Sequence, residues 1–302
     1  MNKIKIWFKG KMINRADASI SVLSPAAQFG LNVFEGIRCY WSSENEELYA
    51  FRLHDHLIRL MESTKLMRIP CPYDLDQMKN YFIESVASND LKENIAVRMT
   101  LFVDGEGTWH SEECSSLFIS PISVNKNNLE GKSACISSWE RINDNSMPPR
   151  VKCGANYISG RYSHLDAKKS GFDLPIMLNN AGHIAEGAGA CIFIVRNNKL
   201  ITPSYASSIL ESITRSTIVK FAEDLGMDVT ERDVGRTELY ISDEIFLCGS
   251  AAEITPILAV DNIEIGLGVV GPVTKILYDR YLDIVTGRIE KHMDWLTPIY
   301  KK

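Results

Sequence analysis

The sequence predicts a mixed α/β (α+β) fold with two domains, and three observations support this prediction. Patterns typical of strands alternate with patterns typical of helices along the chain. The 302 residues are enough for two medium-sized hydrophobic cores. A polar segment without periodicity separates the two halves. We therefore expect a small N-terminal α/β domain at residues 1–122, an interdomain linker at 123–133 and a large C-terminal domain at 134–302.

In the first half, a short turn-rich stretch at Val22–Leu31 precedes a predicted strand at Val33–Tyr40. His54–Arg68 has the pattern of a helix, and a second helix is expected to follow Asp74. Each helix has one face of regularly spaced side chains, formed by Leu57, Leu60, Met61, Thr64 and Met67 in the first and by Met78, Phe82 and Val86 in the second.

A strand is predicted at Ile95–Val103, because its side chains alternate cleanly in character. The positions expected to face the core are Ile95, Val97, Met99, Leu101 and Val103. Arg98 must then point to the opposite side, together with Ala96, Thr100 and Phe102. The alternation by itself favours a solvated face on that side.

In the second half, strands are predicted at Pro175–Leu178, Cys191–Val195 and Glu244–Leu247. Helices are predicted at Asn156–Lys169, Ile213–Leu225 and Pro272–Val285, and Gly226 ends the second of them. A cleft between two such domains is the natural place for a ligand.

The composition argues against several classes of protein. Hydrophobic residues make up 45% of the chain and charged residues 24%, which is typical of a soluble globular protein. A net charge of −5 without a basic cluster argues against nucleic acid as a partner. No stretch reaches the roughly 20 apolar residues that span a bilayer, and the N-terminus lacks the apolar segment of a signal peptide. The seven scattered cysteines form no metal-binding motif and fit reduced thiols, so we expect a cytoplasmic protein without a metal.

Two segments contain ionisable side chains that could act in catalysis. Lys152 stands directly before a predicted helix, and lysine is the side chain that forms Schiff bases. A surface lysine is the more frequent explanation of such a residue. Glu186 lies between a strand-like run and two glycines, and a carboxylate there could hold a pyridine nitrogen protonated. An exposed glutamate in a glycine-rich turn explains the same pattern.

Two further segments could bind an anion. Ser207–Arg215 leads into a helix, whose first amides suit a phosphate, although an ordinary cap by Ser212 explains the same residues. Cys248–Ala252 follows a strand and could present amides and a hydroxyl, although a plain connecting turn is the alternative.

In order and spacing, these segments resemble the fold-type IV aminotransferases, and most closely the branched-chain amino acid aminotransferases. The similarity covers nearly the whole chain. The matching motifs are Val33–Tyr40, Lys152–Tyr157, Glu186–Gly189, Gly249–Pro256 and Gly271–Lys275. The resemblance implies the two-domain architecture of this family, with the active site between the domains, and a homodimer or higher homo-oligomer.

The resemblance also implies pyridoxal 5′-phosphate (PLP) as the cofactor. Lys152 would form the Schiff base and move the proton between the substrate α-carbon and the cofactor C4′. Glu186 would pair with the pyridine nitrogen, Tyr157 would bind the phenolic oxygen and Leu210 would pack on the ring. The residues implied for the phosphate are Arg59, Ser250 and the amides of Ile213 and Thr214.

The same resemblance implies a substrate site. The amides of Ser250 and Ala251 would hold the α-carboxylate of the substrate. The residues implied for the side-chain pocket are Phe34, Gly36, Arg38 and Arg98, of which Arg98 suits a glutamate carboxylate.

The sequence departs from the family pattern at several of these places. Cys191 stands where the family usually has asparagine, and Glu211-Ser212 replaces a usual Pro-Gly. An anionic Glu211 would repel a phosphate unless its side chain turns outward. Phe29 and Ala96 occupy positions where branched-chain enzymes commonly have tyrosines.

The sequence therefore predicts a transaminase that moves an amino group between an amino acid, L-glutamate or a branched-chain L-amino acid, and a 2-oxo acid. The alternatives are a D-amino acid aminotransferase, an aminodeoxychorismate-type lyase, and a biosynthetic aminotransferase with another substrate. A family member without catalytic activity is the alternative from a different class.

Overall fold

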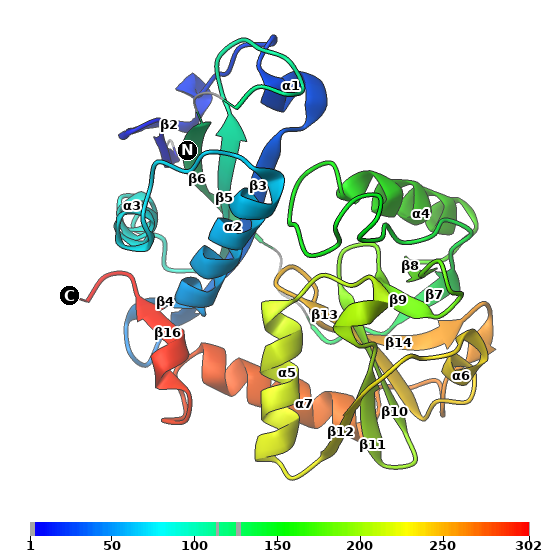
Figure 1. Cartoon of the computed structure of the whole chain (residues 1–302). Helices are drawn as coiled ribbons and strands as arrows, with labels where there is room; N and C mark the ends of the chain where they lie inside the picture. Colours follow the sequence, from blue (N-terminus) through cyan, green and yellow to red (C-terminus); the bar gives the residue numbers. More distant parts are fainter. Residues whose placement is uncertain (1–3, 113–114, 125–127, 302) are drawn as a thin grey trace. The chain divides into compact units, whose positions relative to one another are not determined.

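The computed structural model describes residues 4–112, 115–124 and 128–301, and the chain forms two compact units (Figure 1). The first unit comprises Met1–Lys126, Val151–Ala155 and Asp283–Lys302. The second comprises Asn127–Arg150 and Asn156–Leu282. The chain thus returns twice to the first unit, with segments that the sequence analysis assigned to the C-terminal domain. The predicted linker includes residues 125–127, which lie outside the described residues.

The first unit is built on an antiparallel sheet of seven strands in the order β16-β4-β3-β5-β6-β1-β2. The strands are β1 (Lys5–Phe8), β2 (Lys11–Asn14), β3 (Asn32–Ser42), β4 (Glu47–Phe51), β5 (Ile95–Val103), β6 (Ser115–Ser123) and β16 (Leu296–Pro298). The helices are α1 (Pro25–Phe29), α2 (Leu53–Met67) and α3 (Leu75–Ala87), with 3-10 turns at Arg15–Asp17 and Met293–Trp295.

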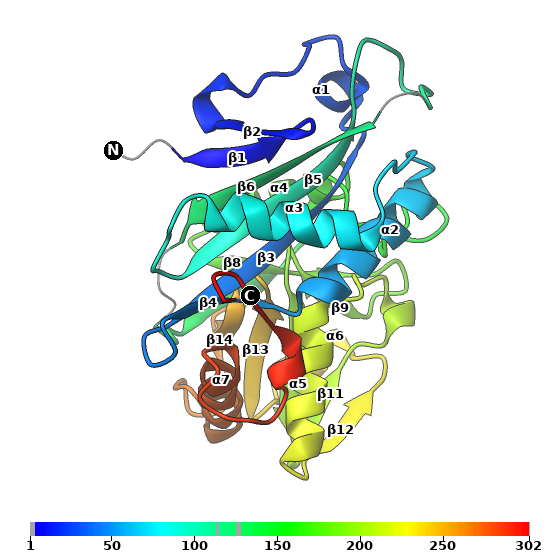
Figure 2. The ribbon, with the colours of Figure 1, turned by 90° about the vertical axis from the view of Figure 1, so that its left-hand side faces the viewer.

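The helices α2 and α3 lie side by side against one face of this sheet, and their apolar faces form one core with it (Figure 2). The predicted core positions of β5 are all buried there, as are Leu57 and Leu60 of α2 and Met78, Phe82 and Val86 of α3. Asp74 caps α3 by exchanging hydrogen bonds with Gln77 in a capping box. The strands and helices predicted in this half are confirmed.

The opposite face of β5 corrects one expectation. The alternation favoured a solvated face, but Thr100 and Phe102 are buried there, and Phe102 packs against Phe8 and Phe118. The interpretation of this face as solvated is therefore wrong, because aromatic side chains from neighbouring strands cover it. Arg98 lies on the same face and is partly buried.

The second unit contains a mixed sheet of nine strands in the order β12-β11-β10-β13-β14-β7-β8-β9, with β15 paired to β14. The strands are β7 (Lys132–Ile136), β8 (Leu174–Leu178), β9 (Ile184–Gly187), β10 (Cys191–Arg196), β11 (Lys199–Thr202), β12 (Asp228–Glu231), β13 (Glu244–Gly249), β14 (Glu253–Val260) and β15 (Ile263–Glu264). The helices are α4 (Tyr157–Lys169), α5 (Ile213–Asp224), α6 (Arg236–Leu239) and most of α7 (Pro272–Val285), whose last three residues belong to the first unit. A 3-10 turn lies at Tyr205–Ser207.

The helices predicted in the second half are confirmed as α4, α5 and α7, and the strands as β8, β10 and β13. Ser212 caps α5 by accepting from the amide of Arg215. Phe221 of α5 packs edge-on against Tyr281 of α7, so these two helices touch where they cross (Figure 1). In the part of the chain that the structure describes, no helix combines the length and the apolar character needed to cross a bilayer.

Candidate active site

The strands β3 and β5 present four predicted site residues on one face of the first unit's sheet. Side chains alternate along a strand, so Phe34, Gly36 and Arg38 share a side of β3. Gly36 pairs directly with Arg98 of β5 in the antiparallel register. A Cβ atom added to Gly36 would meet no heavy atom within 4 Å, so this glycine leaves open space beside Arg98.

Lys152 is held against this same face. Its backbone carbonyl accepts a hydrogen bond from the amide of Phe34 at 2.9 Å, and its amide donates to the Ser63 hydroxyl at 3.2 Å. Cys153 forms an isolated antiparallel β-bridge with Val33, so the chain passes beside the start of β3 at this point. The Nζ atom of Lys152 lies 5.0 Å from the centre of the Phe34 ring, and the Arg98 guanidinium lies 4.2 Å from it. The structure therefore brings Lys152, Phe34 and Arg98 together.

A buried ionic cluster lies on the other side of β3. Glu35 is fully buried, and its carboxylate accepts hydrogen bonds from Nε and Nη2 of Arg59 at 2.8 and 2.7 Å. Nδ1 of His56 lies 2.6 Å from the same carboxylate. Burial alone raises the pKa of Glu35, but the Arg59 and His56 charges and hydrogen bonds outweigh it and hold the pKa far below its usual range. Burial also lowers the pKa of His56, although Glu35 opposes this shift.

In the second unit, Glu186 lies in the buried strand β9, and its carboxylate is surrounded by polar groups. Glu186 is 3% exposed, and Nε of Arg141 forms an ion pair with it at 2.6 Å that is not aligned as a hydrogen bond. The amide of Leu210 donates to its other oxygen at 3.3 Å. The two residues expected at the pyridine nitrogen and on the ring face therefore lie next to each other.

Cys191, the first of the departures from the family pattern, contacts this carboxylate directly. Its Sγ atom lies 3.7 Å from Glu186 and 3.6 Å from the carbonyl oxygen of Leu210. Burial, followed by the Glu186 charge, raises the pKa of Cys191 to about 12. The thiol therefore stays protonated at neutral pH and can act as a weak donor to the carboxylate.

Tyr157 begins α4 and is placed beside the glycines that follow Glu186. A Cβ atom at Gly189 would lie 3.5 Å from the Tyr157 ring. A Cβ atom at Gly160 would lie only 2.5 Å from the carbonyl oxygen of Ala188, so α4 approaches this loop as closely as a glycine permits. The glycines thus allow the phenol ring to stand against the segment that carries Glu186.

The N-terminus of α5 presents the predicted phosphate amides. Ile213 and Thr214 are its first two residues and are buried. First-turn amides have no acceptor within their own helix, which makes this end suited to an anion. The preceding Glu211 pairs with Arg150 at 2.7 Å, and Arg150 also pairs with Asp144 at 2.9 Å. The charge of Glu211 is therefore compensated by a partly exposed arginine.

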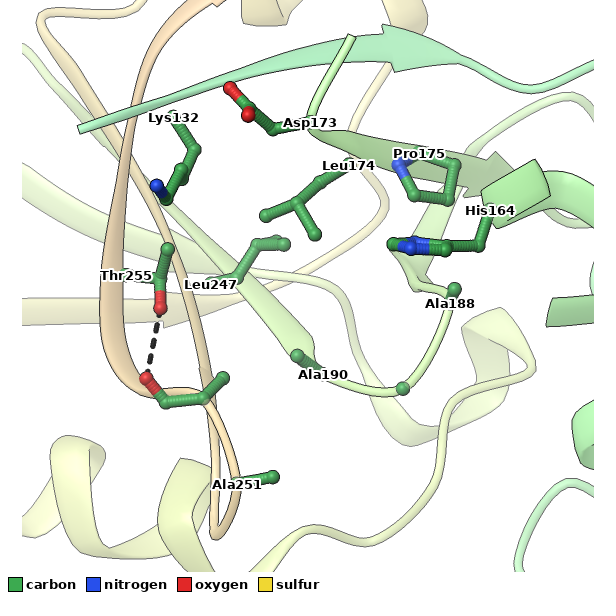
Figure 3. A pocket seen from close by; sticks show the side chains of 12 residues that line it. Lys132, His164, Asp173, Leu174, Pro175, Ala188, Ala190, Leu247, Ala251 and Thr255 are labelled. Carbon is green, nitrogen blue, oxygen red and sulfur yellow. Dashed lines mark hydrogen bonds between the residues drawn. The ribbon is translucent and has the colours of Figure 1, made fainter. Parts of the chain in front are cut away.

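The second unit also forms a cavity of about 490 Å³ (Figure 3). Its lining is largely apolar and small, with Lys132, His164 and Asp173 as its ionisable residues. Ala251, predicted to bind the substrate carboxylate, lines this cavity, and Ala252 accepts a hydrogen bond there from Thr255. Glu186 does not line it. The cavity thus reaches the predicted substrate turn but does not coincide with the predicted catalytic groups. Ser250 begins this turn and is partly buried.

Sequence reasoning missed two residues in contact with predicted site residues, and a third behind one of them. Glu35 binds Arg59, and Arg141 pairs with Glu186. His56 contacts the carboxylate of Glu35 rather than Arg59. Glu35 stands inside the recognised Val33–Tyr40 motif, so its charge at a core-facing position was a readable signal. Arg141 lies in a loop without periodicity, and no local pattern identifies it.

The donor set of the described residues fits PLP. Lys152 supplies an amine beside an aromatic ring for the aldehyde, and Glu186 supplies a buried carboxylate for the pyridine nitrogen. The start of α5 supplies amides for the phosphate. Among the described residues, no cluster of three or more His, Cys, Asp or Glu could hold a metal ion.

Comparison with known proteins supports this interpretation. The sequence profile of the amino-transferase class IV family matches residues 32–260. The branched-chain-amino-acid aminotransferase of Escherichia coli K12 is 36% identical over 302 residues, which cover 97% of each chain. A probable branched-chain-amino-acid aminotransferase of Aquifex aeolicus is 35% identical over 98% of this chain and 97% of its own.

Solved structures agree with the sequence comparison. The PLP form of a branched-chain amino acid aminotransferase from Thermobaculum terrenum has a TM-score of 0.95 at 38% identity, covering 99% of both chains. The branched-chain aminotransferase of Thermoproteus uzoniensis with norvaline has a TM-score of 0.93 at 37% identity, covering 98% of this chain and 99% of its own.

The fold and the donor set together define a PLP-dependent enzyme of mixed α/β architecture. The chain belongs to the class IV aminotransferase family and is a fold-type IV, PLP-dependent aminotransferase. The predicted family, fold class, enzyme class and cofactor are confirmed.

Proposed function

We propose that this enzyme transfers an amino group from L-glutamate to a branched-chain 2-oxo acid. In the reverse direction it transfers the amino group from a branched-chain L-amino acid to 2-oxoglutarate. The observation that carries the proposal is the Phe34 ring, which has the Lys152 amine and the Arg98 guanidinium both within 5.0 Å of its centre. The Lys152 amine, which would react with the cofactor, and the Arg98 cation, which would bind the side-chain carboxylate of glutamate, thus both lie beside the apolar Phe34 ring. The relatives named as branched-chain aminotransferases support the same substrates.

The catalytic roles follow from the chemistry of the side chains. PLP, when bound, supplies an electron sink for the negative charge that develops at the substrate α-carbon. Lys152 is the residue that attaches the cofactor, and its amine moves the proton at the substrate α-carbon. Glu186 pairs with the pyridine nitrogen, while Arg141, the Leu210 amide and the Cys191 thiol hold its carboxylate in place. Tyr157 binds the phenolic oxygen.

The same face of β3 and β5 can accept two kinds of side chain. Arg98 offers a guanidinium to the γ-carboxylate of glutamate. Phe34 and the open space at Gly36 offer an apolar surface to a branched side chain, with Arg38 further along the strand. The α-carboxylate would be held by the amides of Ser250 and Ala251, and the phosphate by Arg59, Ser250, Ile213 and Thr214.

We also propose that the enzyme acts as a homodimer in the cytoplasm. One face of α4 leaves apolar side chains exposed, namely Ile158, Tyr162 and Leu165, and Trp139 stacks on Tyr162 at 5.0 Å. A contiguous exposed apolar surface of this kind supports a subunit contact. The cysteines of the described residues are free thiols, as expected in a reducing compartment.

A panel of amino donors tests this function. Holoenzyme mixed with L-glutamate, L-leucine or L-valine in the absence of a 2-oxo acid should lose the absorbance of its Schiff base, because the amino group moves to PLP and the conjugated imine is lost. The D-isomers should leave the absorbance unchanged. Reaction confined to D-amino acids would favour the D-amino acid aminotransferase instead, and reaction with none of the donors would contradict the proposal.

The role of Arg98 gives a second prediction. Arg98→Met should raise the KM for L-glutamate by about 10-fold to 100-fold, because a charged hydrogen-bond partner of its side-chain carboxylate is lost. The KM for L-leucine should change by less than about 3-fold, since methionine keeps an apolar surface beside Phe34. Steady-state kinetics with both donors measure the two values. An equal change for both substrates would contradict the assignment of Arg98 to the glutamate side chain.

A further inference from the structure

Glu35 occupies a position where a charged side chain is costly. It lies on the core-facing side of β3, between Val33 and Ile37, which are both fully buried. Removing an ionised carboxylate from water is strongly unfavourable unless it is paired and hydrogen-bonded. The neighbouring Phe34 and Gly36 point to the opposite face, where the proposed substrate side chain binds.

The partners of Glu35 come from one stretch of α2. Its carboxylate receives Nε and Nη2 of Arg59 in a two-point contact at 2.8 and 2.7 Å, which fixes the plane of the guanidinium. The carboxylate can only accept, so the 2.6 Å contact with His56 requires the proton on Nδ1. His56 is 2% exposed, so this contact lies inside the core.

This pairing changes what Arg59 can do. The negative charge of Glu35 balances the positive charge of the guanidinium, so the net charge of the pair attracts an anion only weakly. Binding of an anion then depends mainly on the direction in which the N–H groups of Arg59 point. The two-point contact with Glu35 restricts this direction, because an arginine side chain is long and otherwise has many rotamers.

We propose that Glu35 is a positioning residue that orients the Arg59 guanidinium toward the phosphate of PLP. His56 supports it by holding the second carboxylate oxygen. The inference rests on the proposed function, in which Arg59 binds the phosphate. On this account β3 carries both tasks, with substrate contacts from Phe34 and Gly36 and phosphate orientation through Glu35.

The test separates the phosphate from the rest of the cofactor. The full-length chain, stripped of cofactor, is titrated with PLP and with pyridoxal, which has the same aldehyde and ring but no phosphate. The absorbance of the protein-bound form gives a Kd for each. In Glu35→Gln the Kd for PLP should rise about 10-fold to 100-fold, because one of the two oxygens that accept from Arg59 is replaced by an NH2 group, which cannot accept. The Kd for pyridoxal should change by less than about 3-fold.

Glu47→Gln is the matched control. Glu47 is another fully buried glutamate of the first unit, but it accepts backbone amides, those of Leu48, Ile299, Tyr300 and Lys301. This variant should unfold at a lower temperature while keeping the wild-type ratio of the two Kd values. A purely structural role of Glu35 predicts the same behaviour for Glu35→Gln.

The outcomes are distinct. If the ratio of the Kd values for PLP and pyridoxal is the same in Glu35→Gln as in the wild type, the orienting role is overturned. An equal rise of both Kd values is one form of this result. If Glu35→Gln does not fold, Arg59→Lys provides the measurement, because it keeps the charge but cannot make the two-point contact. A wild-type ratio in Arg59→Lys would overturn the proposal. A wild-type chain that forms no bound species with PLP would overturn the proposed function itself, and the orienting role with it.

Discussion

Replacement of Lys152 by alanine is expected to abolish covalent attachment of PLP and to lower the rate of transamination by about 1,000-fold or more. The variant loses the amine that we propose binds the aldehyde and moves the proton at the substrate α-carbon. The remaining fold should be intact, because Lys152 is anchored through its backbone contacts with Phe34 and Ser63. Absorbance of the bound cofactor and steady-state rates measure the two effects.

Lys199→Ala is a suitable control for this experiment. Lys199 is an exposed lysine of the second unit that pairs only at the surface with Asp228, at 3.0 Å. Its loss should leave both the absorbance and the rate within about 2-fold of wild type, as expected for a surface ion pair. Wild-type turnover in Lys152→Ala would show that another amine performs the chemistry.

Glu186→Gln should lower turnover by about 100-fold to 1,000-fold while the cofactor stays bound. The amide is nearly isosteric, so attachment at Lys152 and the phosphate contacts are retained. It carries no negative charge, however, and cannot stabilise a protonated pyridine nitrogen, so the ring becomes a weaker electron sink. Rates with L-glutamate and the amount of bound PLP per chain measure the effect.

Two details of the structure sharpen this second experiment. Arg141 lies against Glu186, and in the variant its charge would face a neutral amide, so part of the loss could come from displacement of the side chain. Arg141→Gln separates the two causes, because it leaves the carboxylate charge in place. We expect a smaller loss in Arg141→Gln than in Glu186→Gln, and equal losses would contradict the direct role of Glu186.

The long elements of this fold are predictable from sequence because each buries one regular face. The helix α2 and the strand β5 show this well, since their period matches the burial of their side chains. Four-residue strands such as β1 and β11 are too short to display a period, and pairing with distant strands defines them. Likewise, no local signal shows that Cys153 pairs with Val33 of β3.

The residues of the candidate site were predicted mainly from the order in which several family motifs follow one another along the chain. The pattern of residues within each single segment did not identify them. Lys152 resembles a surface lysine until its contacts with Phe34 are known. Arg59 lies off the apolar stripe of α2, and only the buried carboxylate of Glu35 on another strand explains why it is 7% exposed. Such pairs join residues that are far apart in sequence, so periodicity within one element cannot reveal them.

The central claim is that Lys152 is the residue to which PLP is covalently attached. Reduction of the holoenzyme with borohydride, followed by proteolysis and mass spectrometry, identifies the modified lysine directly. We expect one phosphopyridoxyl group per chain, on the peptide that contains Lys152-Cys153-Gly154. A phosphopyridoxyl group on a different lysine, with Lys152 unmodified, would contradict the central claim.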